Sequence, residues 1–194
     1  MFFKRKYDFK PDRTDSGMLK KLYMTPIQRK RLLKWGLVGL VLLVLSLVQD
    51  TMLSQLSIYG ATFDLVACGI LLAGMFFDPD ATGLFTLISS TLYYFSGTAP
   101  GSYSIALLTG LGTLLCIFRR SYLQRCFSAI FLCACIGMMV YELLVFGIGL
   151  FLSITTPDRI GVFVLRGALS VAVMPLLYPA FLSISNIGGE LWKE

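Results

Sequence analysis

Two isolated residues of opposite charge lie deep within separate apolar runs of the sequence. Glu142 falls in the run 126–154, and Arg166 falls in the run 160–184. At the centre of a membrane helix a charge costs about 2.5 to 3.5 kcal/mol, so such residues usually face the bundle interior, pair and mark function. Counted from the loop between the runs, their depths differ by roughly 8 Å, which two long side chains can bridge. We therefore expect an intramembrane ion pair between Glu142 and Arg166. The alternative is that each finds backbone or water partners separately.

Hydroxyl side chains form a stripe along the apolar segment 79–96. They recur at offsets of four, seven, eight and eleven residues, which places them on one face of a helix. The stripe consists of Thr82, Thr86, Ser89, Ser90 and Tyr93. We expect this face to point inward. It either packs helices through small polar contacts worth about 0.6 kcal/mol each, or it lines a solute cavity.

Two acidic residues are expected at the outer ends of helices. Asp64 opens the second apolar segment, where the helix dipole stabilises an acid, so it can serve as a helix cap. Asp50 lies near the outer end of the first apolar segment and has no such explanation. Asp50 could pair with Arg159 or with an external partner; the alternative is that it has no partner role.

Small residues recur at a spacing of four in the fifth apolar segment, at Ala129, Cys133 and Gly137. Such spacing lets two helices approach closely in a membrane. It predicts a packing face for another helix, which can belong to this chain or to a partner.

The residues needed for most enzymatic chemistry are missing. The chain has no histidine, and it has no paired carboxylates, Ser–Lys dyad or phosphate-binding loop at useful spacing. Its cysteines lie in or beside apolar runs, which favours free thiols over disulfides or a metal site. They are Cys68, Cys116, Cys126, Cys133 and Cys135. We expect no enzymatic activity, no cofactor, no metal and no nucleic-acid partner.

The composition indicates an all-α integral membrane protein. Hydrophobic residues make up 56% of the chain and charged residues 14%, and the mean hydropathy is +0.76. We expect a transmembrane domain at 35–187 containing helices at 35–56, 63–77, 79–96, 102–118, 126–154 and 160–185. The second helix would reach only about 22 Å, which is short for a hydrocarbon core of about 30 Å. The six-span interpretation therefore has a four-span alternative, in which the second and third helices form a re-entrant hairpin.

The distribution of basic residues predicts the orientation. Eleven of the seventeen lie between Lys4 and Lys34, and all except Arg159 and Arg166 fall on segments expected to be cytoplasmic. Both termini are therefore expected inside, with a basic tail at 1–34 and a short C-terminal segment at 188–194. The tail mixes basic and aromatic residues, which suits anionic lipid headgroups, and Thr25 with Pro26 forms a helix start. No signal peptide is evident.

The order of these features resembles the bacterial rod shape-determining protein family MreD, over residues 48–187. The resemblance rests on Asp64 opening an apolar helix and on the turn 78–83 before the third helix. It continues with the segment 92–97 followed by Gly101 and Ala106, then Tyr141 to Leu144, Gly167 and Pro175. None of these residues is a catalytic signature.

The resemblance implies a non-enzymatic scaffold in the bacterial cytoplasmic membrane. Such a scaffold binds the single-span protein MreC and helps couple the actin-like MreB to RodA and its class B penicillin-binding partner. Its role is to maintain rod shape and lateral peptidoglycan synthesis. Members of this family also resemble the six-helix substrate-binding subunits of energy-coupling-factor transporters, which implies that fold.

That second likeness supplies the alternative function, a substrate-binding subunit of a vitamin-type transporter. In that case the hydroxyl stripe, Glu142 and Arg166 would line a solute pocket. Those subunits typically dock through an Ala-xxx-Ala face in the first helix, whereas 36–56 contains no alanine.

Overall fold

The computed structural model describes residues 26–53, 59–77, 79–122 and 127–185. Within these ranges the chain is all-α, as the sequence predicts, and it has no β-strand. The helices are α1 (Pro26–Val48), α2 (Leu65–Gly74), α3 (Pro79–Phe95), α4 (Tyr103–Tyr122), α5 (Phe127–Phe151) and α6 (Ile160–Ser185). A π-helical turn, Gln49–Leu53, continues α1, and a 3-10 turn, Pro157–Arg159, precedes α6. The predictions for the tail 1–24, Thr25, Asp78, Cys126 and the segment 188–194 lie outside the described residues.

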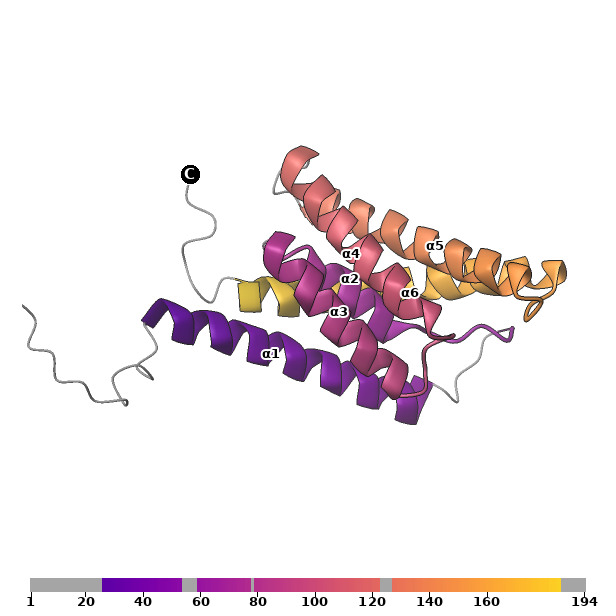
Figure 1. Ribbon diagram of the computed structural model, residues 1–194, viewed down its shortest axis with the longest axis horizontal. Coiled ribbons are helices and arrows are strands. Elements are labelled where there is room, and N and C mark those ends of the chain that lie inside the picture. The colour runs from indigo at the N-terminus through magenta and orange to yellow at the C-terminus, as the bar shows by residue number, and fades with distance from the viewer. Residues whose placement is uncertain (1–25, 54–58, 78, 123–126, 186–194) are drawn as a thin grey trace, which may run out of the picture.

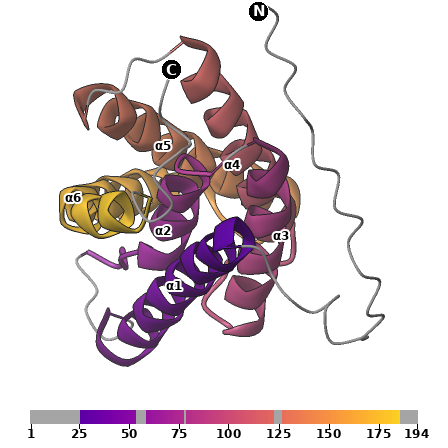
Figure 2. The ribbon, with the colours of Figure 1, turned by 90° about the vertical axis from the view of Figure 1, so that its left-hand side faces the viewer.

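Helix α2 forms the centre of the bundle. All ten of its residues are buried, and it contacts α1, α3, α4, α5 and α6, which surround it in Figure 2. Its sequence is apolar on every side, which is the pattern of a fully buried helix. At Gly69 a Cβ atom would lie 2.9 Å from a terminal methyl group of Leu42, so any larger residue there would require the Leu42 side chain on α1 to shift.

In the part of the chain that the structure describes, four helical segments are long and apolar enough to cross a membrane, which indicates a multi-pass membrane protein. They are Leu32–Thr51, Tyr103–Tyr122, Phe127–Phe151 and Pro157–Ser185. Large apolar side chains are exposed on their outer surfaces and on α3, as lipid contact requires. Examples are Leu40, Leu43, Leu84, Leu92, Leu114, Leu132 and Leu176.

The second helix is shorter than the expected 63–77. Asp64 caps its N-terminus and Met75 its C-terminus, so α2 has ten residues and spans about 15 Å. The Asp64 cap ends the helix on its N-terminal side, so the helix does not begin at residue 63. Both ends of α2 lie inside the protein, where surrounding helices can satisfy the backbone groups that lipid could not.

One end of the bundle carries buried basic side chains. Lys34 Nζ donates a hydrogen bond to the Phe76 carbonyl oxygen at 3.3 Å, and the Arg119 guanidinium lies 5.5 Å from the Phe76 ring centroid. The Tyr178 ring lies 5.8 Å from that of Phe76 and 4.6 Å from that of Phe127. These contacts join the early part of α1, the end of α2, the end of α4, the start of α5 and the later part of α6. Figure 1 shows the start of α1 and the end of α6 on the same side. We call the residues that make these contacts the basic end; they are Lys34, Phe76, Arg119, Phe127 and Tyr178.

Candidate functional site

Away from the basic end, charged and hydroxyl side chains from α2, α3, α5 and α6 meet inside the bundle. We call this cluster the polar node and define it as Asp64, Tyr93, Glu142, Arg166 and Ser170. Arg166 Nη2 lies 2.7 Å from Asp64 Oδ2, and Arg166 Nε lies 3.3 Å from Glu142 Oε1. The side chains of Asp64 and Glu142 are 0% and 2% exposed, and that of Arg166 is 17% exposed. The expected contact between Glu142 and Arg166 is present, but one guanidinium faces two acids.

Asp64 is the most highly bonded member of the polar node. Its Oδ1 accepts a hydrogen bond from the Ala67 amide at 3.1 Å, and its Oδ2 accepts one from the Tyr93 hydroxyl at 2.7 Å. Its own amide donates to Ser170 Oγ at 2.9 Å. Asp64 therefore caps α2, as expected, and its charge is favoured by the helix dipole.

The Asp64 carboxylate lies in the interior of the bundle and is not at its surface. Because α2 is short and central, its N-terminus lies within the bundle and the residue is fully buried. Asp50 lies in the π-helical turn and is partly buried, and Arg159 is exposed in the 3-10 turn.

Helix α6 positions two groups of the node one turn apart. Arg166 and Ser170 lie on one face, and Ser170 Oγ donates to the Arg166 carbonyl oxygen at 2.9 Å. Gly167 lets α6 approach α5, because a Cβ atom there would lie 2.9 Å from Met139 Sδ and 3.5 Å from Glu142 Cγ. The absence of a side chain at Gly167 thus brings Arg166 within reach of α5.

Glu142 and its neighbour Tyr141 are buried without a hydrogen-bond partner. They are 1% and 0% exposed, and neither Glu142 oxygen nor the Tyr141 hydroxyl bonds to any residue that the structure describes. Most buried polar groups in proteins have such a partner, so each exception needs an explanation. Glu142 Oε1 lies 3.3 Å from Arg166 Nε, so the positive charge of Arg166 is close to Glu142 although the two atoms form no hydrogen bond.

The hydroxyl stripe on α3 faces inward, as predicted, because all five of its side chains are buried. Thr82 Oγ1 donates to the Gly74 carbonyl oxygen at 3.0 Å and so satisfies the end of α2. Thr86 donates to the Thr82 carbonyl oxygen at 2.8 Å, and Ser90 lies 3.2 Å from the Thr109 hydroxyl on α4. These contacts favour the packing interpretation for most of the stripe.

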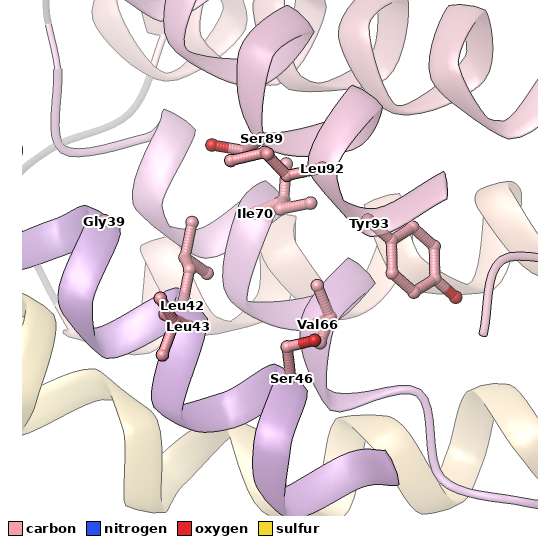
Figure 3. A pocket seen from close by; sticks show the side chains of 9 residues that line it. All are labelled: Gly39, Leu42, Leu43, Ser46, Val66, Ile70, Ser89, Leu92 and Tyr93. Atoms are coloured by element: carbon pink, nitrogen blue, oxygen red, sulfur yellow. The ribbon is translucent and has the colours of Figure 1, made fainter. Parts of the chain in front are cut away.

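A cavity of about 240 Å³ lies between α1, α2 and α3 (Figure 3). Its lining consists of Gly39, Leu42, Leu43, Ser46, Val66, Ile70, Ser89, Leu92 and Tyr93. The lining is mainly apolar, and Glu142 and Arg166 do not contribute to it. This cavity is therefore not the predicted solute pocket, whose lining would also include the ion pair.

The small-residue face of α5 packs against α4 of the same chain. Cys133 and Gly137 are buried, and a Cβ atom at Gly137 would overlap the Leu115 side chain. Ala129 is partly buried. The packing interpretation therefore holds for Gly137, whose close contact is with Leu115 of this chain. The role of this face toward a partner helix stays a prediction.

Neither metal ligation nor disulfide formation is found in the described part of the chain. Cys68, Cys116, Cys133 and Cys135 are free thiols, as expected. No group of three or more metal-ligating side chains forms among the described residues.

Sequence reasoning missed the central contact of the site, between Asp64 and Arg166, and the hydrogen bond from Tyr93. The spacing of Arg166 and Ser170 was the one signal that α6 has a polar face. No protein-family model, curated protein or solved structure matches the chain. Interpretation of the site therefore depends on its residues and their geometry.

Proposed function

We propose that this chain is a non-enzymatic membrane scaffold of the MreD type, which binds MreC within the bacterial wall-elongation complex. One observation carries the proposal. The residues that define the resemblance are scattered through the sequence, yet Asp64, Tyr93 and Glu142 meet in the polar node, and Gly167 packs against Glu142. A pattern of residues that meets at one buried contact is more specific than the same residues dispersed over the surface.

The bonding of the node supports a scaffold over a solute-binding protein. Arg166 joins α6 to Asp64 on α2 and to Glu142 on α5, so its charge is used within the chain. The cavity has a mainly apolar lining, and Tyr93 is the one residue of the polar node in it. Because the interior polar groups bond to one another, the outer helix faces are the surfaces left for partner proteins. A chain with little mass outside the membrane would assemble a complex by binding the helices of other membrane proteins to these faces.

The proposed topology is six spans with both termini in the cytoplasm, in a fold like that of the energy-coupling-factor substrate-binding subunits. The chain direction alternates along the bundle, and Lys34 and Arg119 lie at the basic end, where Arg29, Lys30 and Arg120 are exposed. The positive-inside rule favours a cytoplasmic location for this end. In this scheme α2 counts as a span although it is short, because the other five helices surround it. Helix α3 counts as a span because it exposes apolar side chains such as Leu84 and Leu92.

The proposed partners follow from this orientation. MreC would contact an apolar outer helix face, and MreB, RodA and the class B penicillin-binding protein would join through the complex. The basic end and the basic tail 1–34 would face anionic lipid headgroups in the cytoplasmic leaflet.

A vitamin-type transporter subunit is the second candidate, and two observations favour it. Glu142 and Tyr141 present buried polar atoms without hydrogen-bond partners among the described residues. Ser46 and Ser89 also place hydroxyl groups at the wall of the 240 Å³ cavity, where a small ligand could bond to them.

Depletion of the protein in its native organism tests the proposal. We expect cells to become round and to lose lateral incorporation of a fluorescent wall precursor, with both defects corrected by re-expression of the wild type. Cells that keep their shape, and whose growth is restored by a vitamin mixture, would contradict the scaffold and support the transporter. A Ser89→Leu variant, which fills the cavity, should still restore shape if the cavity holds no substrate.

A further inference from the structure

We propose that the Glu142 carboxyl group, where α5 meets α2 and α6, is a binding site for one proton. The inference does not depend on the scaffold function. It rests on the juxtaposition of two buried acids with one guanidinium, and on the bonds that each acid makes.

The two acids are bonded unequally. The Asp64 carboxylate accepts hydrogen bonds from Arg166, Tyr93 and the Ala67 amide, at 2.7, 2.7 and 3.1 Å. Three donors at one carboxylate stabilise its ionised form. Glu142, by contrast, accepts no hydrogen bond from the residues that the structure describes, and Arg166 Nε approaches it at 3.3 Å without bonding geometry. Asp64 therefore takes the strong interaction with the guanidinium.

The charges around Glu142 do not balance when both acids are ionised. Its titratable neighbours are Arg166 from α6, Asp64 from α2, Tyr103 from α4 and the adjacent Tyr141. Two carboxylates and one guanidinium leave one negative charge in a site that is almost completely buried. An uncompensated charge is very costly there, and a proton on Glu142 removes it.

A proton fits the site better than a metal ion does. No cluster of three or more His, Cys, Asp or Glu side chains occurs in the described ranges, so a divalent cation would lack the set of side-chain ligands that it needs. A protonated carboxyl is both a donor and an acceptor, and the Tyr141 hydroxyl beside it is also unbonded among these residues. Arg166, which is 17% exposed, is the member of the Asp64–Arg166–Glu142 set closest to the surface. Loss of the proton would place two anions against one cation, and the Glu142 carboxylate on α5 would then repel the Asp64 carboxylate at the start of α2.

Labelling of the wild-type protein in lipid nanodiscs with a hydrophobic carbodiimide tests the proposal, because this reagent attacks protonated carboxyl groups in apolar surroundings. Peptide mass spectrometry should find Glu142 modified at neutral pH and Asp64 unmodified. Above the titration midpoint, the protonated fraction should fall about tenfold for each pH unit. Absence of modification at Glu142 down to mildly acidic pH would overturn the proposal. So would protection of Glu142 by sodium chloride, relative to choline chloride at the same pH, because it would identify a sodium site.

Infrared spectroscopy provides a second measurement on the same preparation. We expect a protonated-carboxyl band at neutral pH that disappears in Glu142→Gln and persists in the matched control Asp158→Asn, whose side chain is exposed. A band that persists in Glu142→Gln would assign the proton to another acid and overturn the proposal. If that variant fails to fold, the labelling of the wild type decides the question.

Discussion

Arg166→Gln removes the one cation that faces both acids of the polar node. Asp64 and Glu142 are 0% and 2% exposed, so water cannot take the place of the guanidinium without rearrangement. Removing one partner of a buried ion pair typically costs about 3 to 5 kcal/mol. Asp64 keeps its hydrogen bonds from Tyr93 and the Ala67 amide, which favours the low end, about 3 kcal/mol. The ratio of folded to unfolded protein should then fall about a hundredfold.

The assay is reversible unfolding in mixed detergent micelles, followed by tryptophan fluorescence. Trp35 reports on the core, because its ring centroid lies 5.2 Å from that of Phe77 and 5.8 Å from that of Phe85. The matched control is Arg159→Gln, which removes an exposed arginine and should change the free energy of unfolding by less than about 0.5 kcal/mol.

A double-mutant cycle distinguishes a lost ion pair from a general defect of folding. Asp64→Asn combined with Arg166→Gln should cost less than the sum of the two single changes, with a coupling free energy of about 1 to 3 kcal/mol. Because the pair is largely buried, the coupling should change little with salt. Additive losses, or an Arg166→Gln variant as stable as the wild type, would refute the reasoning.

Two further changes test contacts made by α3, one with Asp64 and one with α4. Tyr93→Phe removes a hydrogen bond to the Asp64 carboxylate and should lower the free energy of unfolding by about 1.5 to 3 kcal/mol. The control Tyr94→Phe, at an exposed site, should have little effect. Equal losses of stability in the two variants, measured in the same micelle assay, would argue against the bond. Gly112→Ala places a Cβ atom 2.7 Å from Thr86 Cγ2 and should lower the melting temperature through overpacking of about 1 to 3 kcal/mol. In the control Gly110→Ala, on the same helix, the added Cβ atom meets nothing within 4 Å, so this variant should melt at or above the wild-type temperature. A lower melting temperature for Gly110→Ala than for Gly112→Ala would show that α3 and α4 pack differently.

Local sequence signals predicted several features of the fold. Pro26 and Pro79 begin helices as expected, because proline at the first helical position needs no amide donor. The period of the hydroxyl stripe gave the inward face of α3, since one face of a helix is fixed by spacing alone. The contact between Glu142 and Arg166 followed from the cost of isolated charges in apolar runs.

Features that depend on the arrangement of helices in space were not predictable from one sequence. The sequence pattern of an acid at the start of a helix predicts an N-terminal cap at the protein surface. Asp64 is instead a buried partner of Arg166, because α2 lies at the centre of the bundle. The spacing of Cys133 and Gly137 indicates close packing without saying which helix packs there, and Leu115 on α4 occupies that place. The length of α2 was overestimated because apolar residues continue beyond both of its caps.

Purification of the tagged protein from its native membrane in mild detergent tests the scaffold proposal most directly, with mass spectrometry of both co-purifying proteins and bound small molecules. We expect MreC and the elongation synthases in the purified fraction, without a stoichiometric small molecule. Recovery of an energising ATPase pair, or of a stoichiometric vitamin, would contradict the scaffold and assign the interior of the bundle to substrate binding.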